Sequence, residues 1–173
     1  MESFCQAEKM ELPPKASPGQ WWRLVIKSVG GMDAWEKSHG TPEWTVALHG
    51  TSTGAASRIL RSGFEPAHNL TANVSGVYVE GMHRKENVMQ YATHSHDHPL
   101  PPNFMAAVVL EAKIDKRFTK KVHKQWVQPD PHSVVVVAAL VHIIDVQTVY
   151  HKGFSGWIRV ARRSVESLQA ATT

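Results

Sequence analysis

The chain has 173 residues, of which 42% are hydrophobic and 20% charged, and its formal net charge is +4. This length and composition suit one globular domain and exclude a wholly disordered chain, and no apolar run is long enough to span a membrane. Cys5 is the only cysteine, which excludes an intrachain disulfide and a four-cysteine zinc site. The modest positive charge permits anionic partners such as nucleotides or nucleic acid without requiring one.

The first 19 residues are polar and interrupted by prolines, which predicts a flexible N-terminal arm over residues 1–19. A single domain follows over residues 20–173. The segment MESFCQAEKMELPP has neither the basic start nor the apolar core of a secretory signal. We therefore expect an intracellular protein, in the cytoplasm or the nucleus, with no membrane partner.

The rest of the chain alternates short β-rich runs with two modest helical patterns. Residues 20–29 are apolar and fit either a short helix or a strand. The segment WTVAL predicts a buried strand at residues 44–48, and helical spacing follows at residues 52–60 with Gly63 as its terminator. A second helix is predicted at residues 84–92, and further strands at 74–80, 104–114, 125–128 and 134–149. This order predicts an α+β fold in which strands outnumber helices.

The tetrapeptide Leu48-His49-Gly50-Thr51 stands where the first of these strands ends and a helix begins. Glycine lets a ligand approach the backbone, the start of a helix offers free N–H groups to an anion, and an imidazole can hydrogen-bond a hydroxyl. A tight strand-to-helix turn with an incidental histidine also explains these residues. The motif alone therefore does not decide between a binding site and a turn.

Two further motifs follow in the sequence. Gly76-Val77-Tyr78-Val79 lies on a predicted strand, and Tyr91-Ala92 ends the second predicted helix. Alone, the two tyrosines are most simply core residues. The segment QWVQPDPHSV, which begins at Gln125, predicts a strand, a turn and another strand.

Taken together and in this order, these motifs resemble the ADP-ribosyltransferase superfamily, and most closely its diphtheria-toxin and poly(ADP-ribose) polymerase branch. The resemblance covers roughly residues 44–145 and implies a split antiparallel β core with short flanking helices. It also implies that NAD binds as a substrate in a cleft between two half-sheets. Mono-ADP-ribosyl transfer to an acceptor, a protein or a nucleic acid, is the activity that the resemblance implies.

The resemblance also implies roles for individual residues. His49 corresponds to the histidine that hydrogen-bonds the nicotinamide ribose, and the backbone of Gly50 would hold the carboxamide, with Thr51 completing the cofactor-binding motif. Tyr78 corresponds to the tyrosine of the Gly-hydrophobic-Tyr strand. Tyr91 corresponds to the tyrosine that stacks on the nicotinamide ring, although it lies two residues further along the chain than in the family pattern.

The chain departs from the family at one position, because Gln125 stands where the catalytic glutamate is expected. A carboxylate there stabilises an oxocarbenium-like transition state, and its loss costs about 2–4 kcal/mol, or roughly 10²–10³ in rate. We therefore expect no polymer elongation, but slow mono-ADP-ribosyl transfer, NAD glycohydrolysis or binding without turnover. Glu80 and Glu111 are substitute carboxylates, although we expect both to be solvated residues on strand faces.

Two alternatives remain open. The Gln125 substitution favours a non-catalytic module that binds NAD, ADP-ribose or a protein partner. A NAD-dependent RNA 2′-phosphotransferase shares the fold and the His-Gly pair, and the basic residues of the connector at 115–124 suit it, although the segment before His49 is short for that family. The run His94-Ser95-His96-Asp97-His98 contains metal-ligand types, but we interpret it as a solvated loop and predict no metal site.

Overall fold

A computed structural model describes residues 6–10, 20–26, 31–69, 74–88, 90–92, 104–123 and 125–145. The predicted loop with the run His94-Ser95-His96-Asp97-His98 lies outside the described residues, as does the chain beyond residue 145.

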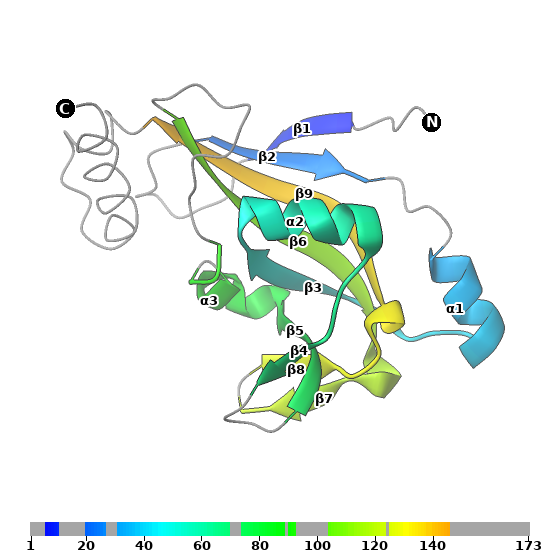
Figure 1. Cartoon of the computed structure of the whole chain (residues 1–173). Helices are drawn as coiled ribbons and strands as arrows, with labels where there is room; N and C mark the ends of the chain where they lie inside the picture. Colours follow the sequence, from blue (N-terminus) through cyan, green and yellow to red (C-terminus); the bar gives the residue numbers. More distant parts are fainter. Residues whose placement is uncertain are drawn as a thin grey trace.

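Within the described residues the chain forms one nine-stranded sheet in which all paired strands are antiparallel (Figure 1). The strand order is β1-β2-β9-β6-β3-β5-β8-β7, and β4 pairs with β5 off this path. The strands are β1 (Gln6–Met10), β2 (Gln20–Val25), β3 (Trp44–Thr51), β4 (Ala67–Asn69), β5 (Val74–Gly81), β6 (Phe104–Asp115), β7 (Lys120–Val122), β8 (Gln125–Gln128) and β9 (Val134–Asp145).

The described helices are fewer and short. They are α1 (Gly31–His39), α2 (Thr53–Ser62) and α3 (Lys85–Val88), with 3-10 turns η1 (Met82–Arg84), η2 (Lys116–Phe118) and η3 (Pro131–Ser133). This content confirms the predicted α+β class with strands outnumbering helices. In the described part of the chain, no helix has the length and apolar character needed to cross a membrane.

The sheet has a wide half and a narrow half that meet at β5. Along its whole length β3 pairs with β6, but it pairs with β5 only through Ala47 with Gly81 and Leu48 with Glu80. Elsewhere β5 pairs with β8 and with β4. Figure 1 shows β4, β5, β7 and β8 grouped below the wide half formed by the other strands. The two halves therefore separate as β3 and β5 diverge, which creates a fork.

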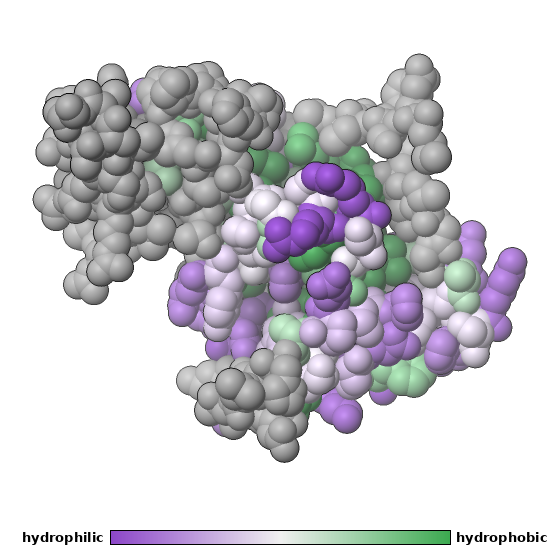
Figure 2. Space-filling model, in the orientation of Figure 1, coloured by the Kyte–Doolittle hydropathy of each residue, from purple (hydrophilic) through white to green (hydrophobic). Residues whose placement is uncertain are grey.

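Helix α2 forms where the sequence predicts it, because its ends carry strong local signals. The Ser52 side chain accepts a hydrogen bond from the backbone N–H of Ala55 at 3.2 Å, and the N–H of Gly63 donates to the carbonyl of Ile59 at 2.8 Å. Gly63 has φ of 83°, which glycine adopts without strain. Ala56 is the buried residue of α2, and the helix lies along β6 in Figure 1. Figure 2 shows hydrophilic side chains on the outward side of this region.

Both faces of the wide half are packed, which explains the continuous apolar run of β6. Successive side chains of a strand point to opposite faces. Val108 and Leu110 accordingly pack with Ala56 of α2, whereas Ala107 and Val109 pack with Val88 of α3 on the other face. The position of α3 is therefore fixed by burial against the sheet, although α3 is only one turn long.

The structure differs from the sequence-based expectations where tertiary contacts determine the type or the length of an element. The helix predicted at residues 84–92 is wrong in extent: α3 ends at Val88, where turns follow with Tyr91 N–H donating to the Val88 carbonyl at 3.0 Å. The apolar segment at 20–29 supplies strand β2. The predicted N-terminal arm contains β1, which pairs with β2.

The charged connector is not simply a solvated run, because a buried carboxylate organises it. Asp115 is fully buried and accepts hydrogen bonds from Arg117 Nη2 at 2.6 Å and from the indole Nε1 of Trp35 at 3.0 Å. The hydrogen bonds from Arg117 are the main reason that the pKa of Asp115 is lowered. Asp115 thereby joins α1 to the start of the connector, which continues through η2 into β7.

Candidate functional site

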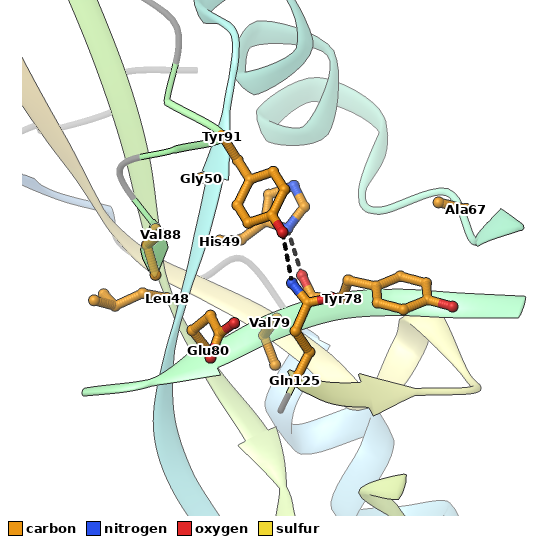
Figure 3. Close-up of a pocket in the computed structure, with 10 residues that line it drawn as sticks. All are labelled: Leu48, His49, Gly50, Ala67, Tyr78, Val79, Glu80, Val88, Tyr91 and Gln125. Carbon is orange, nitrogen blue, oxygen red and sulfur yellow. Dashed lines mark hydrogen bonds between the residues drawn. The ribbon is translucent and has the colours of Figure 1, made fainter. Parts of the chain in front are cut away.

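A pocket of about 440 Å³ lies where β3 and β5 diverge, and Figure 3 shows the residues that line it. Its volume falls within the range of about 300–1,000 Å³ that is typical of small-molecule sites. Side chains and backbone from β3, β4, β5, β8, α3 and the turn after α3 form its walls. The pocket contains five of the six residues that the sequence nominates for the site: His49, Gly50, Tyr78, Tyr91 and Gln125.

His49 occupies the fork itself. Its Nδ1 lies 2.8 Å from the backbone carbonyl oxygen of Tyr78, just beyond the last ladder pair between β3 and β5. A carbonyl oxygen can only accept, so Nδ1 carries the proton and donates it. The edge-on ring of Phe64, with its centroid 5.1 Å from that of the imidazole, packs against His49. The tautomer and the ring orientation of His49 are thus both fixed.

The environment of His49 favours its neutral form. Burial lowers the pKa of the imidazole, and the hydrogen bond to the Tyr78 carbonyl opposes that effect only in part. With the proton on Nδ1, Nε2 carries a lone pair and has no hydrogen-bond donor among the described residues. His49 therefore presents an acceptor to the pocket, which suits a ligand hydroxyl group.

Gly50 is required by the protein's own backbone. A Cβ atom at this position would overlap the carbonyl oxygen of Val88 and would stand 3.0 Å from the Cβ of Tyr91. The absence of a side chain at Gly50 therefore allows α3 and the turn after it to lie directly against β3. Gly50 also lines the pocket, so its expected role in admitting a ligand to the backbone stays a prediction.

Tyr91 and Gln125 form one side of the pocket. The turn after α3 carries Tyr91, which lines the same pocket as His49 (Figure 3). Gln125 begins β8, and its Nε2 donates to the hydroxyl oxygen of Tyr91 at 3.3 Å. The ring of Tyr91 remains half exposed, with 52% of the residue accessible to solvent. An aromatic surface of this kind is available for stacking on a planar ligand.

Tyr78 lines the pocket, and its backbone and side chain make separate contacts. Its hydroxyl donates to the backbone carbonyl of Val74 at 2.6 Å, and Figure 3 shows the ring pointing away from His49. The backbone carbonyl of Tyr78 is the atom that touches the site residue His49. Thr51, also nominated from the sequence, is buried at the end of β3 and is not among the residues that line the pocket.

The expectation that Glu80 is a solvated strand residue is wrong, because only 4% of it is exposed and it lines the pocket. Its Oε2 is buried and has no hydrogen-bond partner among the described residues, while Nη1 of Arg84 lies 3.5 Å away. Alternation along β5 places residues 78 and 80 on the same face of the strand, which is the sequence signal that links Glu80 to the candidate site. A glutamate is usually exposed, which is why the residue type alone predicts a solvated position.

Glu111, the other substitute carboxylate, has a different environment. Both of its oxygens accept from the guanidinium of Arg23, at 2.9 Å each, on the wide half of the sheet. It is partly buried by this ion pair and does not line the pocket. Of the two carboxylates, Glu80 alone therefore belongs to the candidate site.

Within the described ranges, no cluster of three or more histidine, cysteine or acidic side chains is arranged to hold a metal ion. The pocket brings together a neutral imidazole, an aromatic ring, an amide and a carboxylate. No protein-family model matches the chain, and no curated protein matches its sequence.

Proposed function

We propose that this protein is an NAD-dependent ADP-ribosyltransferase with the split antiparallel sheet of that superfamily. In this reaction the bond between nicotinamide and ribose breaks, and a single ADP-ribose is transferred to an acceptor or, slowly, to water. The observation that carries the proposal is the pocket at the fork, into which His49, Gly50, Tyr91 and Gln125 converge from separate elements.

The chemistry of His49 supports the proposal. A neutral imidazole with its proton on Nδ1 offers Nε2 as an acceptor, and each ribose hydroxyl of NAD is a donor. The hydrogen bond to the Tyr78 carbonyl holds the imidazole in this state before a ligand arrives. Such preorganisation lowers the free-energy cost of orienting the ligand.

The ring of Tyr91 supports the nicotinamide half of the proposal. Its ring is half exposed and lines the same pocket as His49, so a planar pyridinium could stack on it while the attached ribose reaches the imidazole. A cationic ring placed over the face of a tyrosine gains electrostatic energy from the ring quadrupole. The two groups together suit a ligand in which a positively charged ring is joined directly to a sugar.

Gln125 limits the reaction that we propose. Its amide can hydrogen-bond a ribose hydroxyl, but it carries no charge with which to stabilise an oxocarbenium-like transition state. Repeated transfer to build a polymer is therefore not part of the proposal. Transfer of one ADP-ribose to a protein or nucleic-acid acceptor, and hydrolysis of NAD, are the reactions that we assign.

The test is release of nicotinamide from NAD by the purified chain, with calorimetric titration of NAD on the same sample. We expect His49→Ala to lower release by roughly 10²-fold or more, because it removes a positioned contact to the reacting sugar. His132→Ala is the matched control, since His132 is exposed and does not line the pocket. The proposal would be refuted if the wild-type chain neither bound NAD nor released nicotinamide.

A second function is favoured by the contact between Gln125 and Tyr91. An amide in place of a carboxylate at this position suits a module that binds NAD or ADP-ribose without cleaving it. The same experiment separates the two functions. NAD binding that depends on His49, without nicotinamide release, would identify the binding module.

A further inference from the structure

We infer that Glu80 supplies the carboxylate of the reaction in place of Gln125, as a catalytic residue on the neighbouring strand. This inference rests on the proposed function. It assigns to Glu80 the task of facing the ribose carbon from which nicotinamide departs. The family pattern places this charge on β8, whereas in this chain it would stand on β5.

The position of Glu80 in the sheet is the first argument. The strands β5 and β8 pair in a register that sets Tyr78 opposite Val127 and Val79 opposite Trp126. One step further in the same register sets Glu80 opposite Gln125. Directly opposed residues of an antiparallel pair share a face and have Cβ atoms about 4.5–5.5 Å apart. A carboxylate at position 80 is therefore a cross-strand neighbour of the amide at position 125.

The face on which Glu80 lies is the second argument. Val77 and Val79 pack into a hydrophobic cluster on one side of β5. Because strand side chains alternate, Glu80 points to the opposite side. Both Glu80 and Gln125 line the pocket, as Figure 3 shows. Moving the charge from one strand to the next thus keeps it at the wall of the same cavity.

The incomplete hydrogen bonding of Glu80 is the third argument. A buried carboxylate oxygen without a donor is costly, and such groups in native proteins commonly have a role in function. Oε2 of Glu80 is such an oxygen among the described residues. Arg84 lies on one side at 3.5 Å, which is close enough for ionic attraction but not for a strong hydrogen bond.

Arg84 is itself held in place, so it does not simply neutralise Glu80. The side-chain oxygen of Asn87, in the amide orientation that satisfies both groups, accepts from Nε of Arg84 at 3.1 Å. The guanidinium is therefore directed toward Asn87 as well as toward Glu80. Arg84 therefore lies beside Glu80 without hydrogen-bonding Oε2, whose acceptor capacity remains available to a ligand.

The step that we assign to Glu80 balances without a further reactant. The bond between the ribose carbon C1′ and the pyridinium nitrogen breaks, and its electron pair neutralises that nitrogen as nicotinamide leaves. An oxygen of water or of the acceptor forms the new bond to C1′. The carboxylate of Glu80 stabilises the positive charge that develops on the ribose and takes the proton lost by the attacking oxygen.

The experiment compares Glu80→Gln with Glu111→Gln in nicotinamide release from NAD. Glutamine keeps the shape of glutamate and removes the charge in both variants. Glu111 is a fitting control because it is partly buried and, like Glu80, lies beside an arginine on a nearby part of the sheet, but it lies outside the pocket. We expect Glu80→Gln to lower kcat by roughly 10²–10³-fold with KM changed by less than about fivefold. Glu111→Gln should retain kcat within about twofold.

A second variant keeps the test valid if Glu80→Gln does not fold, which circular dichroism and thermal unfolding would report. Glu80→Asp retains the charge but withdraws it by one methylene. We expect it to lower kcat by roughly 10–10²-fold, because a displacement of about 1 Å at a reacting centre is enough for such a loss.

Each outcome decides between the inference and the proposed function. Wild-type kcat in a folded Glu80→Gln variant would overturn the role of Glu80 and leave the transferase proposal intact. Wild-type chain that binds NAD without releasing nicotinamide would overturn the role of Glu80 and leave a binding module. Wild-type chain that neither binds nor cleaves NAD would overturn both.

Discussion

The imidazole of His49 and the backbone carbonyl of Tyr78 share a hydrogen bond of 2.8 Å at the point where the ladder between β3 and β5 stops. A side chain thus takes the place of the next backbone donor. The same contact satisfies a carbonyl that would otherwise lack a partner on this side and fixes the proton of His49 on Nδ1. Sheet geometry and the chemical state of the candidate site residue are therefore set together.

The lowered pKa of His49 predicts how ligand binding depends on pH. The neutral imidazole is maintained at pH 7, and protonation requires a pH below the ordinary histidine value of about 6.5. A protonated Nε2 cannot accept a hydrogen bond, so NAD affinity should be constant from pH 8 to pH 7 and should fall only in more acidic solution. Calorimetric titration of NAD over this range measures the effect. His49→Gln does not titrate and should remove the acidic decline.

An NMR titration checks the cause separately. The Cε1 proton of His49 should shift at a pH below the ordinary histidine value of about 6.5. A midpoint at or above that value would contradict the assigned state of His49.

Gly50→Ala should destabilise the fold. The added methyl group would overlap the carbonyl oxygen of Val88, so β3 and α3 would have to move apart. Overpacking of this kind costs about 1–3 kcal/mol in the free energy of unfolding. Urea denaturation measures the loss as a lower midpoint.

Gly54→Ala is the control for the Gly50 variant. Gly54 lies in α2, and a Cβ there would meet no atom within 4 Å. Alanine reduces the number of conformations open to the unfolded chain and favours the helical backbone. We therefore expect the free energy of unfolding to rise by about 0.4–1 kcal/mol. Equal destabilisation by the two substitutions would show that loss of glycine, rather than contact with Val88, is responsible.

Asp115 should make the free energy of unfolding depend on pH in acidic solution. Its pKa is lowered in the folded state, so the unfolded chain takes up the proton first as the pH falls below about 4. The stabilising contribution of Asp115 is thus fully present above that pH and is lost as the pH falls toward the folded-state pKa. The free energy of unfolding, measured by urea denaturation between pH 6 and pH 2.5, should decline in this window.

Asp115→Asn should weaken the structure at neutral pH and remove part of the acidic decline. Asparagine retains one acceptor oxygen but loses the charge that faces Arg117, which costs about 1–3 kcal/mol. Because Arg117 is partly exposed, solvent screens its attraction to Asp115. The expected cost is therefore that of lost hydrogen bonds to a charged group and not that of a fully buried ion pair. Asp33→Asn, at an exposed position of α1, removes the same kind of charge outside the buried cluster and is the control.

Gln125→Glu should have different effects in two backgrounds. In the Glu80→Gln chain it restores a carboxylate to the pocket, and we expect nicotinamide release to recover by at least about tenfold. In the wild-type chain it sets two carboxylates on opposed positions of β5 and β8, where like charges repel, so the gain should be smaller. A larger gain in the wild-type chain would place the missing charge at position 125 and count against Glu80.

Local signals account for the elements that the sequence predicts well. For α2, Ser52 and Gly63 mark the ends and Ala56 marks the buried face. The β-branched content of β6 and β9 identifies them as strands, and β9 continues to Asp145 as one element. Elements that depend on distant partners are harder to predict: the position of α1 depends on Trp35 binding Asp115, eighty residues away in the chain.

In the candidate site, too, some residues are predictable from the sequence and others depend on distant partners. The order of the motifs is sufficient to nominate His49, Gly50, Tyr91 and Gln125, and the pocket contains all four. The environment of Glu80 could not be inferred from its residue type, because a charged residue on a strand is usually solvated. Its burial results from the pairing of β5 with both β3 and β8, which only the folded structure brings together.

Because the junction between β3 and β5 is short, ligand binding in the pocket should affect the stability of the fold. Two residue pairs connect these strands before they diverge, and the space beyond would hold further rungs in an unbroken sheet. A ligand in that space that contacts both strands would connect β3 to β5 where no backbone hydrogen bonds do so. Its binding free energy would then add to the stability of the folded chain.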